Sequence, residues 1–114
     1  MPSMEYSVGF VTTSGMDEAR KIATALVGEK LAACCNIIPV VESIYRWEGK
    51  VSTDAEALMV IKTRRSLEKK VIRRVRELHS YTVPEVIFLS LRSGNPDYIK
   101  WLAESTGKAK EKVK

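Results

Sequence analysis

The sequence predicts an α+β domain of the ferredoxin-like split βαβ type, in which two helices cover one face of a four-stranded antiparallel sheet. Three observations support this class. The expected elements run strand, helix, strand, strand, helix, strand; the two helices are similar in length; and the middle strands form one long ribbon. Right-handed crossovers place both helices on the same side of such a sheet. The opposite face is then left without helices.

The first strand and the first helix come from the N-terminal part of the chain. Residues Glu5–Thr13 are rich in β-branched and aromatic side chains, which favours a strand. We expect Ser14 to cap a helix that ends near Lys30, with Asp17 three residues on as in a capping box. The buried stripe of this helix is expected to comprise Ala19, Ile22, Ala23 and Leu26.

The ribbon follows as two limbs, Asn36–Trp47 and Glu56–Thr63, separated by a polar stretch that includes Gly49. Side chains in a strand alternate between the two faces of the sheet. Apolar residues nevertheless fall on both faces of each limb, although a hairpin with one solvated face should alternate more cleanly. One layer of helices cannot cover both faces, so we expect a second subunit to cover the other.

The remaining elements are two helices with a strand between them. The second helix is expected from Ser66, as its cap, to about His79, and its buried stripe comprises Leu67, Val71, Val75 and Leu78. Val83 and Pro84 break this helix, and Glu85–Leu91 predicts the last strand. A short third helix is expected to begin at Asn95 and Pro96, to present Tyr98, Trp101 and Leu102 on one side, and to end at Gly107.

The length and composition indicate one domain over residues 1–114, with 45% hydrophobic residues and a basic, flexible tail at 108–114. No apolar run approaches the roughly 20 residues of a membrane span, and the N-terminus lacks the features of a secretory leader. We therefore expect a cytoplasmic protein that does not insert into membranes. The two cysteines are neighbours, Cys34 and Cys35, and are expected to be reduced.

The net charge of +5 raises the question of nucleic-acid binding. Eight basic residues and one acid lie between Lys62 and Arg76, but most of the cations in the helix fall outside its apolar stripe. Such a run is typical of a solvated helix face. The second limb of the ribbon also lacks the aromatic residues on which RNA-binding sheets stack bases. We expect no specific nucleic-acid partner, and only weak, salt-sensitive binding to phosphates.

The chain is poorly supplied for catalysis, and we expect no enzymatic activity. It has one histidine, no glycine-rich phosphate loop and no Cys-x-x-Cys motif. His79 has two interpretations. It either interacts with the last carbonyls and the dipole of the second helix, or it binds a metal. With Glu85 and Cys34 it would supply the imidazole, carboxylate and thiolate donors that suit copper or zinc.

Three aromatic residues are expected to pack where copies of the chain meet, namely Tyr45, Trp47 and Trp101.

Five stretches spread over roughly residues 8–105 carry a further pattern. They are EKLAACCNIIP (29–39), SIYRWEGKV (43–51), LMVIKT (58–63), HSYTVPEV (79–86) and DYIKWL (97–102). Together and in this order they resemble the CutA divalent-cation tolerance family.

The resemblance implies a compact, PII-like homotrimer in which long ribbons pack between subunits. It also implies a role in tolerance of divalent metal ions, chiefly Cu²⁺ and less so Zn²⁺. His79 and Glu85 match the family's most distinctive segment, and Cys34 matches the cysteine of its Ala-Ala-Cys motif. Two departures stand out. Ser80 replaces a proline that is usual after the histidine, and residues 11–13 lack a cysteine that some members carry.

Two other functions remain open at this point. One is a trimeric small-molecule sensor resembling the PII signalling proteins, with a ligand in clefts between subunits near Lys62, Tyr81 and the basic helix. The other is a structural or scaffolding trimer, since animal relatives of the family are linked to anchoring of acetylcholinesterase at membranes. Binding of an organic anion without metal would favour the first, and binding of neither metal nor metabolite would favour the second.

Overall fold

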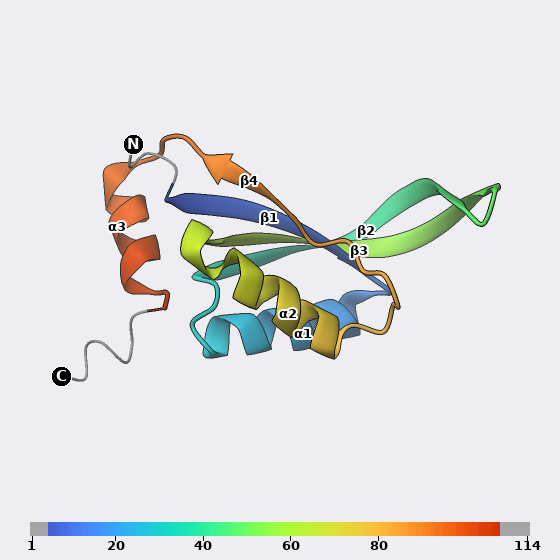
Figure 1. Cartoon of the computed structure of the whole chain (residues 1–114), viewed down its shortest axis with the longest axis horizontal. Helices are drawn as coiled ribbons and strands as arrows, with labels where there is room; N and C mark the ends of the chain where they lie inside the picture. The colour runs from blue at the N-terminus through green and yellow to red at the C-terminus, as the bar shows by residue number, and fades with distance from the viewer. Residues whose placement is uncertain (1–4, 108–114) are drawn as a thin grey trace.

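A computed structural model describes residues 5–107 of the chain (Figure 1). Its elements are β1 (Tyr6–Thr13), α1 (Met16–Gly28), β2 (Cys34–Trp47), β3 (Lys50–Arg64), a 3₁₀ turn (Arg65–Leu67), α2 (Glu68–Leu78), β4 (Ile87–Leu91) and α3 (Pro96–Glu104). The four strands form one sheet in the order β2-β3-β1-β4, and every pair is antiparallel. The predicted fold class is confirmed. The expected tail, residues 108–114, lies outside the described residues.

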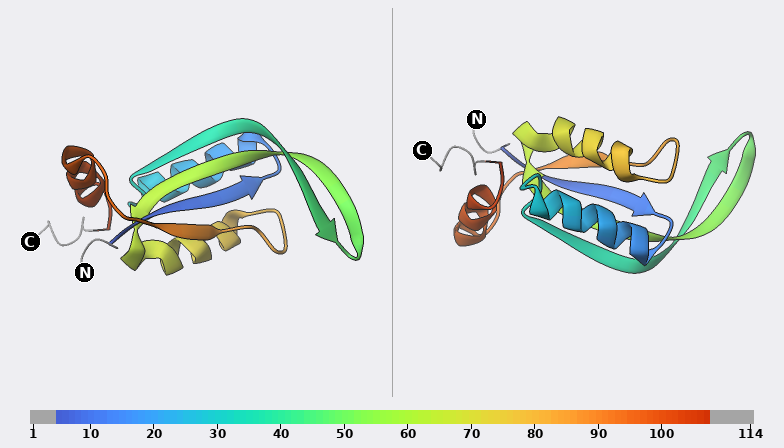
Figure 2. Two further views of the ribbon diagram at one scale, coloured as in Figure 1. Left: turned by 90° about the horizontal axis from the view of Figure 1, so that it is seen from above. Right: turned by 90° about the horizontal axis from the view of Figure 1, so that it is seen from below.

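Both long helices pack on the same face of the sheet, and the opposite face carries no helix (Figure 2). The core lies between this helix layer and the sheet. The four predicted stripe residues of α1 are all buried there, as are Val71 and Val75 of α2. They pack against the inward side chains of the sheet, among them Val11, Met59 and Ile61. The helix stripes were predictable because the period of 3.6 residues selects one face.

The ribbon is longer than the sequence suggested. β3 begins at Lys50, six residues before the expected start at Glu56, because the connection is only the two residues Glu48 and Gly49. Their φ angles are 51° and 80°, as a tight hairpin turn with two left-handed residues requires. The polar residues 52–54, which we expected in the turn, pair with β2 instead. The β2–β3 register shifts once, between Ile38 and Val41.

Two predicted helix caps are wrong, and one is confirmed. Gly15, not Ser14, occupies the N-cap of α1, and no side chain caps it. Ser66 does not cap α2, because the chain first makes the 3₁₀ turn and Leu67 then takes the N-cap position. Asn95 caps α3 as expected: its side chain accepts the Asp97 N–H at 3.1 Å, with proline next to it at the start of the helix.

The remaining boundaries differ from the expected ones by a few residues. α1 ends at Gly28, not near Lys30, because Lys30 has a left-handed φ of 62°. β4 begins at Ile87, not Glu85, since its ladder with β1 stops at the pair of Phe10 and Ile87. α3 lies beyond one end of the sheet, and the ribbon extends beyond the other (Figure 1).

Candidate functional site

The face of the sheet without helices is apolar, and we call it the open sheet face. On β1, alternate residues from Ser7 to Thr13 are buried toward the helices, so the residues between them face the other way. The register then defines the members of the open sheet face: Val8, Phe10, Ile38, Leu58, Val60, Ile87 and Leu89. Leu89 is 59% exposed and Ile87 55%. Apolar side chains this exposed on adjacent positions of a sheet mark an interaction surface.

The ribbon adds exposed apolar side chains beyond the sheet. Val40, Ile44 and Val51 are all exposed, and Trp47 is 54% exposed. Tyr45 donates its hydroxyl proton to Asp54 on the neighbouring strand and is also exposed. In α3, the rings of Tyr98 and Trp101 lie 5.4 Å apart, and both are exposed. The three aromatic residues predicted to lie between copies are therefore accessible in a single chain.

His79 is enclosed and fully engaged within its own chain. Its side chain is buried, and Nε2 lies 2.8 Å from the Thr12 carbonyl oxygen. The Nδ1 atom accepts the Tyr81 backbone N–H at 3.1 Å, so the neutral tautomer with the proton on Nε2 satisfies both contacts. A metal ion at either nitrogen would displace one of these hydrogen bonds. The geometry favours a structural role that ties the end of α2 to β1.

The other two predicted ligands lie elsewhere. Glu85 is exposed in the segment before β4. Cys34 begins β2 opposite Lys62, whose partner on β1 is Val8, whereas His79 contacts β1 at Thr12, four residues further along. A single chain therefore does not gather the three residues into one ligand set. Within residues 5–107, no group of three or more His, Cys, Asp or Glu side chains could hold a metal ion. A metal role for these residues stays a prediction.

The two cysteines differ in environment. The Cys34 thiol lies 3.7 Å from the Asn36 side-chain oxygen, which also accepts a proton from the Lys62 ammonium group. Cys35 packs against the core, and burial together with the nearby Cys34 raises the pKa of its thiol to about 12. Because the thiolate is the form that binds metals and reacts, this raised pKa disfavours metal binding and reaction at Cys35.

A carboxylate that the sequence did not single out joins three segments near His79. Glu18 accepts hydrogen bonds from the Ser14 N–H at 2.9 Å, the Ser14 hydroxyl at 2.8 Å and the Ser80 N–H at 2.6 Å. Burial alone would raise the pKa of Glu18, but these bonds outweigh it and lower the pKa to about 2. The Oε2 atom also lies 3.6 Å from Nδ1 of His79. The i,i+4 spacing of Ser14 and Glu18 was the one local signal.

Tyr81 connects this region to the base of the ribbon. Its hydroxyl donates to the buried Glu56 carboxylate at 2.6 Å, and its ring lies 4.5 Å from that of His79. Burial and the Glu56 contact raise the pKa of the Tyr81 phenol. The pair was not predictable from local pattern, because the two residues are 25 positions apart in the sequence. Hydrogen bonds thus join His79 to Tyr81 and Tyr81 to Glu56, and Glu18 lies beside them with its own bond to Ser80, so these contacts hold the loop before β4.

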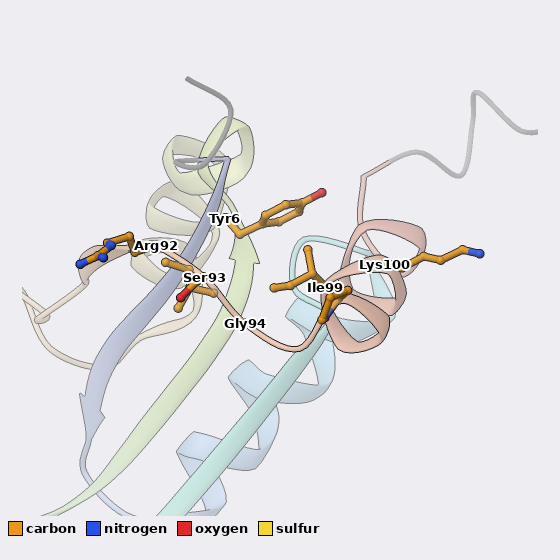
Figure 3. A pocket seen from close by; sticks show the side chains of 8 residues that line it. Tyr6, Arg92, Ser93, Gly94, Ile99 and Lys100 are labelled. Carbon is orange, nitrogen blue, oxygen red and sulfur yellow. The ribbon is translucent and has the colours of Figure 1, made fainter.

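A pocket of about 580 Å³ lies at the other end of the sheet, between the strand ends and α3 (Figure 3). Its walls are formed by Tyr6, Leu91, Arg92, Ser93, Gly94, Pro96, Ile99 and Lys100. Tyr6 and Ile99 extend toward each other across the space, whereas the charged groups of Arg92 and Lys100 extend away from it (Figure 3). The pocket therefore has an apolar interior and a cationic rim.

Comparison with known proteins identifies the family. The chain is 48% identical over 99 residues to the protein named CutA 1, chloroplastic, of Oryza sativa, covering 87% of this chain and 56% of the rice protein. It is 48% identical over 100 residues to the divalent-cation tolerance protein CutA of Thermus thermophilus, covering 88% of this chain and 97% of that protein. The chain thus spans little more than half of the plant protein.

Solved structures agree with this result. The crystal structure of CutA1 from Oryza sativa superposes with a TM-score of 0.89 at 45% identity, covering 93% of this chain and 97% of that one. The structure of the Thermus thermophilus protein superposes with a TM-score of 0.88 at 47% identity, covering 90% of this chain and 99% of that one. Among residues 5–107 we find no helix with the length and apolarity to cross a membrane. The profile of the family described as CutA1 divalent ion tolerance protein matches residues 7–105, and the chain belongs to that family.

Proposed function

We propose that this protein acts in divalent-cation tolerance as a non-catalytic homotrimer whose copies meet through the open sheet face and the ribbon. Tyr45, Trp47 and Trp101 lie in these contacts. The observation that carries the proposal is the apolar open sheet face, with Ile87 and Leu89 more than half exposed in a single chain. Fully burying a leucine or isoleucine side chain contributes about 1.5–3 kcal/mol. Covering several of these partly exposed side chains at once favours assembly and offsets part of the free-energy cost of association.

The two contact surfaces differ from each other, which constrains the symmetry. The open sheet face belongs to the body of the domain, whereas the exposed ribbon side chains lie beyond its end (Figure 1). A contact between two different surfaces is head-to-tail, and it stays finite only when the rotation between copies closes a ring. Three copies related by a three-fold axis form such a ring.

The ion that the protein handles is, in this proposal, Cu²⁺, with Zn²⁺ as the second choice. The support is the family's description and the name of the Thermus thermophilus relative, not a ligand set within one chain. Since residues 5–107 of a single chain hold no three-ligand group, we propose that the ion is held where copies meet. Cys34 and Glu85 are accessible to such a site, whereas His79 is enclosed.

We also propose that the protein works in the cytosol. The rice relative is named chloroplastic and a solved structure from Archaeoglobus fulgidus is described as periplasmic, so members of the family occupy several compartments. A fusion of the chain to a fluorescent protein, followed by cell fractionation, tests this location.

Native mass spectrometry of freshly purified protein tests the function, because one measurement reports both the number of copies and any retained ion. We expect a mass of three chains that gains copper when Cu²⁺ is added and binds no Mg²⁺ under the same conditions. A single-chain mass at low micromolar concentration would contradict the trimer. A trimer that takes up an organic anion but no metal ion would instead support the small-molecule sensor.

A further inference from the structure

The tip of the ribbon comprises Trp47, the turn residues Glu48 and Gly49, and Lys50. It extends away from both long helices (Figure 1), and Trp47 is 54% exposed in a single chain. The turn has a fixed backbone shape, with left-handed φ angles at both of its residues. A large aromatic side chain on a rigid turn loses little conformational entropy on binding. Trp47 therefore has the properties of an anchor for a pocket on another molecule.

The pocket between Tyr6 and Ile99 has complementary properties. Its volume of about 580 Å³ is enough for an indole ring and part of the adjoining turn. An aromatic ring on one side and a branched aliphatic side chain on the other give it apolar walls (Figure 3). Its rim carries Arg92 and Lys100, and none of the residues that line it is acidic. An apolar centre with a charged rim is the usual arrangement of a protein interface.

The pocket is also continuous with the open sheet face. Tyr6 pairs with Leu91 in the β1–β4 ladder, in the same alternating series as the pair of Val8 and Leu89. A copy that covers Val8 and Leu89 therefore reaches the pocket without crossing a polar gap. This continuity favours a second copy of the chain over a small molecule as the occupant.

We propose that Trp47 of one copy inserts between Tyr6 and Ile99 of the next copy. The inference rests on the homotrimer proposed above and specifies its contact. The indole fills the apolar pocket, and Glu48, beside it in the turn, meets the cationic rim of Arg92 and Lys100. Tip and pocket lie at opposite ends of the molecule (Figure 1). Each chain therefore inserts its tip into one neighbour and receives the tip of the other neighbour in its pocket. In a closed ring of three copies, every tip and every pocket is occupied.

Fluorescence of Trp47 in the assembled protein tests the insertion. The chain has two tryptophans, so Trp101→Phe leaves Trp47 as the single emitter. We expect acrylamide to quench Trp47 much less than free N-acetyltryptophanamide. Adding Ile99→Asp should raise quenching toward that of the free indole and raise the concentration of half-dissociation about tenfold or more. Val83→Asp is the control, because Val83 is 70% exposed and does not line the pocket.

Tyr6→Ala removes the opposite wall without adding a charge, and it should give the same change as Ile99→Asp if the latter fails to fold. Charge reversal gives an independent test. Glu48→Lys should raise the concentration of half-dissociation about two- to fivefold, as expected for an exposed ion pair. Combining it with Arg92→Glu and Lys100→Glu should restore assembly.

Two results would overturn the insertion while leaving the trimer standing. One is an intact trimer in which Trp47 is quenched as strongly as the free indole. The other is a protected Trp47 that does not respond to Ile99→Asp or Tyr6→Ala, which would place the tip elsewhere. A parent protein that remains a single chain at all accessible concentrations would overturn the homotrimer and the insertion together.

Discussion

Single residues near the end of α2 hold together segments that are distant in the sequence. Glu18 on α1 binds backbone and side-chain groups of Ser14 and the backbone of Ser80. One ring nitrogen of His79 contacts the Thr12 carbonyl of β1, and the other accepts the Tyr81 N–H of the loop that follows α2. The partners of His79 are partly buried, so removing its ring leaves them without partners, which is costly, whereas those of Glu18 are exposed and can bond to water instead.

Glu18→Gln should lower the free energy of unfolding at pH 7 by roughly 0.5–1.5 kcal/mol, since the amide oxygen is a neutral acceptor and the amide nitrogen cannot accept the Ser80 N–H. The folded pKa of about 2 lies below the ordinary value of 4.5, so the carboxylate contributes stability that is present above pH 4.5 and lost as the pH falls toward 2. Urea unfolding between pH 7 and about pH 2.5 should show a smaller pH dependence in the variant. Asp17→Asn, at an exposed carboxylate, is the control. Identical pH profiles for parent and Glu18→Gln would contradict this account.

His79→Ala should lower the free energy of unfolding by about 1–3 kcal/mol, because the Thr12 carbonyl and the Tyr81 N–H lose their partner. Both nitrogens are already engaged, so we expect Cu²⁺ affinity in titration calorimetry to change little. Glu85→Ala, at an exposed position, should leave stability unchanged and serves as the matched variant. A folded His79→Ala protein that no longer binds Cu²⁺ would show that His79 is a ligand after all.

At the scale of elements, the hairpin turn sets the length of the ribbon. Gly49 has a φ of 80°, and a Cβ added there would meet no atom within 4 Å, so backbone strain alone decides the effect of a side chain. Gly49→Ala should lower the free energy of unfolding by about 1–2 kcal/mol. Gly28→Ala is the matched control, since Gly28 ends α1 with open space around it, and it should raise stability by up to about 1 kcal/mol. Urea unfolding at fixed protein concentration compares the two, and equal effects would contradict the assignment of strain to the turn.

The elements that the sequence predicted well are those with a strong period. The buried stripes of α1 and α2 follow the helical repeat, and the inward residues of β3 follow the two-residue repeat of a strand. The start of β3 was missed because residues 52–54 are polar, as in a loop. These residues lie in the part of the ribbon that extends beyond the core, where a strand does not need an apolar residue at every position. The partners of His79 and Glu18 were missed because they are 67 and 62 residues away, beyond any local pattern.

At the scale of the whole molecule, the helices of one chain cover only one face of its sheet. The C-terminal helix does not change this, because α3 lies beyond the end of the sheet (Figure 1). It is held there by Arg64, which donates to the Ala103 carbonyl at 2.6 Å and to the Thr106 hydroxyl at 2.9 Å, and by the fully buried Leu102. The open sheet face is therefore left without cover in a single chain, and the proposed homotrimer would cover it.

Leu89→Asp should separate folding from assembly. Leu89 is 59% exposed in a single chain, so an aspartate there is solvated and the isolated domain should keep its far-ultraviolet circular dichroism. In the proposed trimer the same position would be covered, so both the lost apolar burial and the buried charge would oppose association. We expect the concentration of half-dissociation, measured by light scattering after size exclusion, to rise at least about tenfold. Val83→Asp, at a 70% exposed position outside the strands, should leave this concentration unchanged. Equal assembly of the parent and the Leu89→Asp protein would mean that the open sheet face is not the contact between copies.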